Sequence, residues 1–132
     1  MLAQVGAGRD DYTHLRCVRS LDGESYARAI SDARLMVAHA GMGSILTALD
    51  KGVPVIVLPR DERYKDARGD HQMQTARQME RMGIVTVAWS EAELMTKIER
   101  ELALPPLSRE PRRRNTELVD YLKSWLRQKL ER

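Results

Sequence analysis

The sequence predicts an α/β fold with a Rossmann-like parallel sheet flanked by helices, and three observations support this fold class. Short apolar runs suited to buried strands alternate with stretches of helical periodicity. The segment 35–59 has the order strand, glycine turn, helix, strand. Each of its apolar runs is short enough for a strand that is buried on both faces of a parallel sheet. Strands that alternate with helices in this way form parallel sheets with right-handed crossovers.

The individual elements follow from apolar patterning and from the residues that begin and end them. Strands are expected at 2–5, 14–21, 35–38, 54–58 and 84–88. Helices are expected from 22 or 25 to 33, and over 44–51, 70–82, 90–102 and 115–130. Residues that favour helix N-termini are Asp22 or Ser25, Asp70, Ser90 with Glu93 as a capping box, and Asn115. Gly52 and Gly83 stand where helices are expected to end.

Length and proline placement predict one domain with an appended segment. The chain has 132 residues with 42% apolar content, which is enough for one core but not for two. Pro105 and Pro106 mark a boundary, so we expect a domain at 1–104 and a second segment at 105–132. That segment carries the basic run 112–114 and an amphipathic C-terminal helix. Its apolar stripe consists of Leu118, Tyr121, Leu122, Trp125, Leu126 and Leu130.

Composition excludes several classes of protein. No window approaches 18 uninterrupted apolar residues, so neither a transmembrane span nor a signal peptide is expected. Cys17 is the single cysteine and cannot form an internal disulfide, which fits a cytoplasmic setting. The net charge of +3 is concentrated near 112–114 and Phe is absent, so no nucleic-acid partner is expected. Acidic residues are dispersed among cations, so no metal site is expected.

The segment 35–59 also predicts a ligand. A strand that leads through Gly41 and Gly43 into a helix N-terminus presents N–H groups and the positive end of a helix dipole. This arrangement binds phosphate or diphosphate. The charged loop 60–69 follows the next strand, at the edge where open α/β sheets place their ligand-binding loops. A nucleotide ligand is therefore expected.

Three motifs follow one another along the chain: His39–Ser44, then Gly52–Pro54 with Val57–Arg60, and then Asp70–Gln72. Together they resemble the C-terminal, donor-binding half of family 28 glycosyltransferases, which have the GT-B fold. The similarity covers 2–102, and its 2–6 stretch matches the second strand of the family pattern. The resemblance is closest to the small subunit of two-component enzymes. These enzymes include transferases of the capsule and exopolysaccharide type, and the enzyme that adds the second N-acetylglucosamine to a dolichol-linked acceptor.

The resemblance implies a UDP-sugar site. His39 would be the catalytic residue, donating a hydrogen bond to the diphosphate as it leaves. Gln72 would contact the sugar hydroxyls, and Thr47 stands where many relatives carry a ribose-binding Glu. No cofactor is implied besides the UDP-sugar, which is the donor substrate. The donor-binding residues would be Gly41, Met42, Gly43, Ser44, Thr47, Arg60, Asp70, His71 and Gln72.

The resemblance further implies a donor-binding catalytic subunit of a UDP-sugar glycosyltransferase in polysaccharide or lipid-linked glycan synthesis. Its expected partner is a membrane-anchored, acceptor-binding subunit, which would hold it at the inner face of the membrane. The alternative is a noncatalytic nucleotide-sugar-binding or scaffolding subunit. An enzyme that uses another nucleotide through an ordinary Rossmann site is disfavoured, because no G-x-G-x-x-G follows the first strand.

Overall fold

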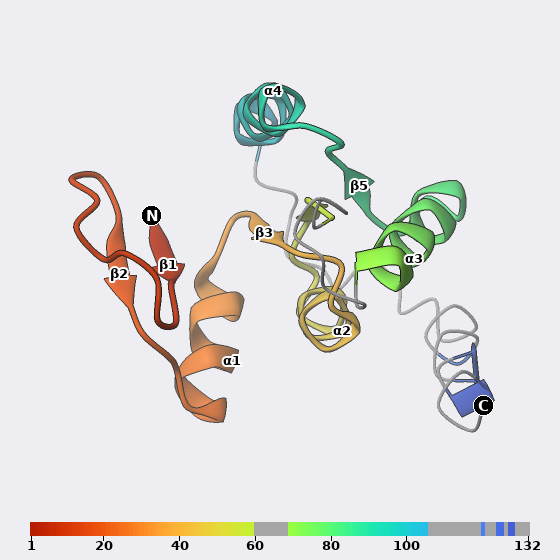
Figure 1. The fold of residues 1–132 in the computed structure, drawn as a ribbon, viewed down its shortest axis with the longest axis horizontal. Coiled ribbons are helices and arrows are strands. Elements are labelled where there is room, and N and C mark those ends of the chain that lie inside the picture. Colours follow the sequence, from red (N-terminus) through yellow and green to blue (C-terminus); the bar gives the residue numbers. More distant parts are fainter. Residues whose placement is uncertain (60–68, 106–119, 121–123, 126, 129–132) are drawn as a thin grey trace. The chain divides into compact units, whose positions relative to one another are not determined.

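The computed structural model describes residues 1–59, 69–105, 120, 124–125 and 127–128, without the side chains of 69–71. The chain divides into two compact units, Met1–Ala33 and Arg34–Arg132 (Figure 1). The predicted loop 60–69 lies almost wholly outside the described residues. The basic run 112–114 lies outside them too, as does most of the predicted last helix. The boundary at 104 and 105 stays a prediction.

The first unit is a parallel strand pair followed by a helix. Strand β1 (Leu2–Gln4) pairs with β2 (Arg16–Val18), and α1 (Gly23–Asp32) follows. Of the two predicted N-caps, the structure has Asp22, whose carboxylate accepts the Ser25 N–H at 2.8 Å. This bond lowers the pKa of Asp22 below its ordinary value. The charged cap therefore stabilises α1 at neutral pH and is lost as Asp22 becomes protonated in acid.

The second unit is a three-stranded parallel sheet with helices on both sides. The strands lie in the order β3-β4-β5. Helices α2 and α3 lie on one side of the sheet, and α4 lies on the other (Figure 1). The predicted fold class is thereby confirmed. The elements are β3 (Met36–Ala38), α2 (Met42–Asp50), β4 (Val55–Val57), α3 (Gly69–Arg81), β5 (Thr86–Val87) and α4 (Glu91–Ala103).

The core of this unit surrounds β4. All three β4 residues are buried, because α2 and α4 both pack on this central strand. Of the positions on α3 that were expected to pack in the core, Ala76 and Met79 are buried, whereas Met73 and Met82 are half-buried. Ile56 and Val57 of β4 and Ile45 and Ala48 of α2 have no exposed surface. The sheet edge that carries the candidate site is thus held by a close-packed core.

Strand β3 differs from its prediction. A strand buried on both faces was expected, but Val37 at its centre is 42% exposed. The reason is that β3 is the edge strand of the described three-stranded sheet. Helix α2 packs against β3, whereas α4, on the other side, packs on β4. An apolar run predicts a strand, but it does not report which faces are covered.

Two glycines end helices as predicted. Gly52 after α2 has φ 68° and Gly83 after α3 has φ 67°, both in the left-handed region. After α3, the Gly83 N–H donates to the Glu80 carbonyl at 2.9 Å and the Ile84 N–H to the Met79 carbonyl at 3.0 Å. These two bonds form a Schellman motif. They satisfy carbonyls that the helix itself leaves without partners.

Gly83→Ala is expected to lower the free energy of unfolding by about 1–2 kcal/mol, because an L-residue is strained in the left-handed region. A Cβ at Gly83 would meet no atom within 4 Å, so backbone strain is the whole effect. Denaturant unfolding measures it. A variant as stable as the parent would show that Gly83 is not required at this helix end.

The start of α4 departs in detail from the predicted capping box. Ser90 caps the helix by accepting the Glu93 N–H at 3.2 Å. The Glu93 carboxylate, however, accepts the N–H of Trp89 at 3.1 Å rather than that of Ser90. This bond, with a further one from Lys97 at 3.3 Å, lowers the pKa of Glu93. Lys97 also donates to the Val87 carbonyl, so the network joins the end of β5 to α4.

Within the described residues, no helix has the length and apolar content needed to cross a membrane.

Candidate functional site

The candidate site lies at the carboxyl edge of the β3-β4-β5 sheet. The three strands are parallel, so their carboxyl ends share one edge. His39 directly follows β3, and Leu58 directly follows β4. Helices α2 and α3 each begin after one of these strands, so their N-termini belong to the same edge. Topology therefore gathers His39, the first turn of α2 and the first turn of α3 at one edge of one sheet.

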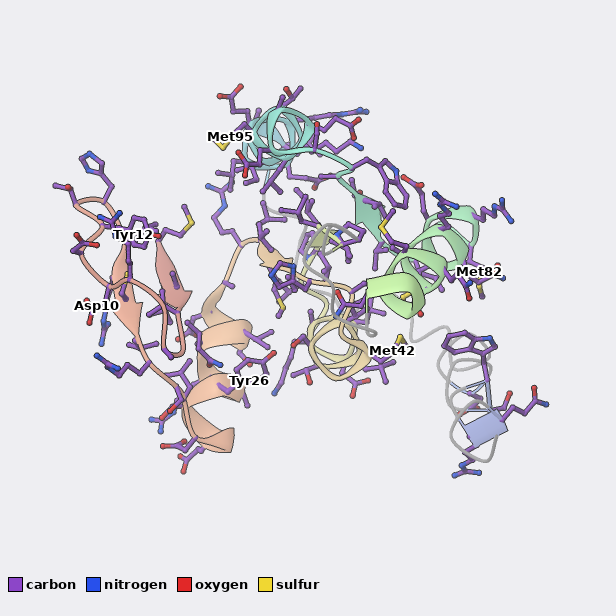
Figure 2. All side chains as sticks on the ribbon, viewed as in Figure 1. Asp10, Tyr12, Tyr26, Met42, Met82 and Met95 are labelled. Atoms are coloured by element: carbon purple, nitrogen blue, oxygen red, sulfur yellow. The ribbon has the colours of Figure 1, made fainter. Side chains whose placement is uncertain are left out.

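The turn between β3 and α2 is shorter than expected. The Gly41 N–H donates to the His39 carbonyl at 2.7 Å, and α2 begins at Met42, two residues before the predicted start at Ser44. Gly41 is the N-cap residue, with φ −82° and ψ 122°. Gly43 therefore lies within the first turn of α2, not in the preceding loop. Met42, the first residue of that turn, is labelled in Figure 2.

The N-terminus of α2 is not capped by any side chain. The first N–H groups of a helix have no intrahelical partner, and the first two of α2 belong to Met42 and Gly43. Neither Gly41 nor Gly43 has a positive φ, so the backbone conformation of this turn does not itself require glycine. A Cβ at either position would meet no atom within 4 Å. The glycines leave open space beside N–H donors, which suits a ligand that approaches the backbone.

His39 is exposed, and its ring is held by the neighbouring strand. The Nδ1 atom lies 2.8 Å from the Leu58 carbonyl oxygen. A carbonyl only accepts hydrogen bonds, so Nδ1 carries the hydrogen. Sequence reasoning missed Leu58 as a partner. The available signal was the pairing of two consecutive parallel strands, which places the residues that follow them side by side.

Thr47 lies one turn further along α2 and is partly engaged within the helix. Its hydroxyl donates to the Gly43 carbonyl at 2.8 Å. The hydroxyl proton is therefore used inside α2, and only oxygen lone pairs remain for a ligand. Ser44 likewise takes part in an interaction within the protein. The predicted role of Thr47 beside a ribose is thus limited to accepting hydrogen bonds.

Gln72 in the first turn of α3 has an unsatisfied polar atom. Its Oε1 is buried and has no hydrogen-bond partner among the described residues. A buried unpaired acceptor costs about 1–3 kcal/mol, so a donor such as a ligand hydroxyl would be stabilising there. Asp70 and His71 belong to α3, but their side chains lie outside the described structure, as does Arg60. Their binding roles stay predictions.

Metal coordination gains no support from the part of the chain that the structure describes. In that part, no group of three or more His, Cys, Asp or Glu side chains could hold a metal ion. The site instead offers backbone N–H groups, an imidazole and an amide. These groups recognise anionic and hydroxylated ligands.

The unit is an α/β domain with an uncapped helix N-terminus at the carboxyl edge of its parallel sheet, which is the arrangement with which such domains bind anions and nucleotides. Residues 3–124 match the glycosyltransferase family 28 C-terminal domain. The chain therefore belongs to this family, which confirms the expected family and its GT-B C-terminal domain.

A relative in Halothermothrix orenii is the UDP-N-acetylglucosamine--N-acetylmuramyl-(pentapeptide) pyrophosphoryl-undecaprenol N-acetylglucosamine transferase. It is 31% identical over 86 residues, which are 65% of this chain and 22% of the relative. The chain thus matches about a fifth of that enzyme's length. No solved structure matches the chain.

Proposed function

We propose that the chain is the donor-binding, catalytic subunit of a UDP-sugar glycosyltransferase in polysaccharide or lipid-linked glycan synthesis. The observation that carries this proposal is the uncapped N-terminus of α2, with open space at Gly41 and Gly43, two and four residues after His39 in the chain. Family membership supports transfer chemistry, and the name of the relative specifies a UDP-N-acetylglucosamine donor for that enzyme.

In the proposed reaction, an acceptor hydroxyl attacks the anomeric carbon while the bond from that carbon to the diphosphate oxygen breaks. UDP leaves with the electron pair. The proton of the hydroxyl passes to a base that we expect in the acceptor-binding half of the enzyme. The first N–H groups of α2 and the His39 ring would stabilise the charge that grows on the diphosphate. These groups are held by sheet and helix, so little reorganisation is needed during transfer.

Titration with UDP-N-acetylglucosamine tests the donor assignment. Calorimetry of the purified chain should show saturable binding with a stoichiometry near one. ATP and NAD⁺ serve as controls, because an ordinary dinucleotide site would prefer them. The alternative function, a scaffolding subunit without a nucleotide site, predicts no saturable heat with any of these ligands.

The acceptor half is proposed to come from a membrane-anchored partner, as in two-component enzymes of the capsule and exopolysaccharide type. The purified chain should then bind the donor but transfer no sugar to a lipid-linked acceptor until that partner is added. A radiolabelled transfer assay with and without the partner measures this. Robust transfer by the 132-residue chain alone would contradict the two-component assignment.

The segment 105–132 is proposed to face this partner. Truncation after Pro111 should then abolish partner pull-down while leaving the melting temperature unchanged. A collapse of the melting temperature would instead assign the segment to the core of this chain.

Gln72→Ala is expected to weaken binding of the UDP-sugar by about 3- to 10-fold, as loss of one neutral hydrogen bond does. Binding of UDP alone should hardly change, because the proposed partner of Gln72 is the sugar. Gln78→Ala is the matched control, since Gln78 is exposed on the same helix. Equal losses for UDP and for the UDP-sugar would contradict the assignment to the sugar.

A further inference from the structure

Only one ring nitrogen of His39 is left for a ligand. Nδ1 donates to the Leu58 carbonyl, 2.8 Å away. The Leu58 N–H in turn donates to the Ala38 carbonyl at 2.9 Å, which ties this residue to β3. Pro59 follows, and a residue before proline is restricted to extended backbone. The carbonyl that holds His39 is therefore itself held in place, and any ligand meets Nε2.

Nε2 offers opposite chemistry in the two protonation states of the ring. When Nδ1 carries the hydrogen, the neutral imidazole has only a lone pair at Nε2. A phosphate oxygen is also an acceptor, so the neutral ring cannot donate to it. Protonation adds both an N–H donor and a positive charge at Nε2. We infer that His39 binds the donor diphosphate in its imidazolium form. Because the hydrogen bond to the Leu58 carbonyl already uses the Nδ1 hydrogen, donor binding then adds a proton at Nε2.

This inference rests on the proposed function, and the charges around His39 support it. Within the described residues, His39 forms no ion pair, and β3, β4 and β5 carry no titratable side chain. The single titratable residue of α2 is Asp50, about 12 Å along the helix axis from its first turn. No carboxylate described on these elements competes for the imidazolium. The diphosphate itself would therefore supply the counter-charge.

Most other charged groups described in this unit belong to α3 and α4; the exceptions are Arg34 before β3, Lys51 at the end of α2, and Asp120 and Arg127 near the C-terminus. On α3, Arg77 lies over the Trp89 ring, 5.6 Å from its centroid. On α4, Glu93 pairs with Lys97. Further titratable side chains on α3 and α4 are Glu80, Arg81, Glu91, Glu99, Arg100 and Glu101, all at least partly exposed. The side chains of 60–71 lie outside the described structure.

Linkage gives the direction of the pH effect. If donor binding takes up a proton, protonation strengthens donor binding by the same factor. A histidine ordinarily changes charge between about pH 5 and 8. Donor affinity should then be constant at the acid end of this range. It should fall by up to about tenfold per pH unit as the ring of the free protein loses its proton.

Calorimetry with UDP-N-acetylglucosamine from about pH 5.5 to 8.5, a range that spans histidine titration, tests the inference. At each pH, buffers with different ionisation enthalpies give the number of protons taken up. A UDP-sugar is the right probe because both of its phosphates are esterified. The terminal phosphate of UDP would itself titrate, as phosphomonoesters do near pH 6. We expect uptake that approaches one proton at the alkaline end, together with falling affinity.

Two variants separate the ring nitrogens. His39→Gln places an amide near Nε2 that does not titrate, so its binding should be independent of pH and without proton uptake. His39→Asn places its amide near Nδ1 and keeps the bond to Leu58 while leaving nothing at Nε2. It should bind more weakly, also without uptake. Circular dichroism checks that both variants fold. His14→Gln, an exposed histidine in the first unit, is the control and should behave as the parent does.

The outcomes distinguish this inference from the proposed function. Donor binding without proton uptake in the parent chain would overturn the inference and leave the UDP-sugar assignment intact. Uptake that survives in His39→Gln but disappears in His71→Gln would assign the proton to His71 and overturn it as well. Absence of donor binding at every pH would overturn both the inference and the proposed function.

Discussion

Gly43→Val is expected to abolish UDP-sugar binding, with a loss of affinity on the order of 100-fold or more. Gly43 lies in the first turn of α2, where a phosphate would approach the backbone N–H groups. A branched side chain would occupy the space that phosphate oxygens need. Loss of two charge-assisted hydrogen bonds of at least about 1.5 kcal/mol each accounts for this factor. Calorimetric titration measures the affinity.

Stability provides the internal control for this variant. A Cβ at Gly43 meets no atom within 4 Å, and Gly43 has no positive φ. Gly43→Ala should therefore stabilise α2 by about 0.5–1 kcal/mol, as alanine does in helices, while it weakens donor binding. Gly83→Ala should do the reverse, lowering stability and leaving affinity unchanged. Undiminished affinity in a folded Gly43→Val variant would remove the diphosphate assignment.

Local signals account for the parts of the fold that the sequence predicted. Asp22 and Ser90 cap helices because a short oxygen-bearing side chain reaches an N–H three residues ahead. Gly83 ends α3 because it adopts the left-handed conformation at no steric cost. All three residues of β4 are buried, as a central parallel strand should be. Each of these features depends on residues that are close together in the chain.

Features set by tertiary structure could not be predicted in the same way. Val37 has the apolarity of a core residue, but its exposure depends on where α4 packs. The start of α2 was placed two residues late, because a glycine suits a turn and a helix N-terminus equally well. The Glu93 carboxylate accepts a hydrogen bond from the N–H of Trp89 rather than from that of Ser90, and the capping-box pattern does not predict this difference.

In the candidate site, too, some features follow from local sequence and others depend on tertiary structure. The motif indicated His39, but the partner that orients it is the backbone carbonyl of Leu58, and a carbonyl has no sequence signature. The buried Oε1 of Gln72 is equally a product of packing. The sequence motifs supply the candidate residues, and the tertiary structure sets the surroundings of each side chain. The sheet register determines which nitrogen of His39 a ligand meets, and hence the protonation state that the ligand requires.

His39→Ala is expected to reduce kcat by about 100-fold in the assembled enzyme, as removal of one preorganised donor does. The loss of donor affinity should be smaller, about tenfold at low pH, which corresponds to one charge-assisted hydrogen bond. The difference arises because the diphosphate gains negative charge as UDP leaves. A donor at Nε2 therefore interacts more strongly in the transition state than in the ground state. Steady-state kinetics with the acceptor-binding partner separate kcat from KM.

Two comparisons decide how His39 acts. His39→Gln retains an N–H near Nε2 and should recover part of the lost kcat, whereas His39→Asn, which keeps only the bond to Leu58, should not. The difference in donor affinity between the parent and His39→Ala should also shrink as pH rises, because the parent loses the proton that the alanine variant never carried. A change confined to KM would make His39 a binding residue only. An affinity gap that is constant across pH would show that the ring contacts the donor without using its charge.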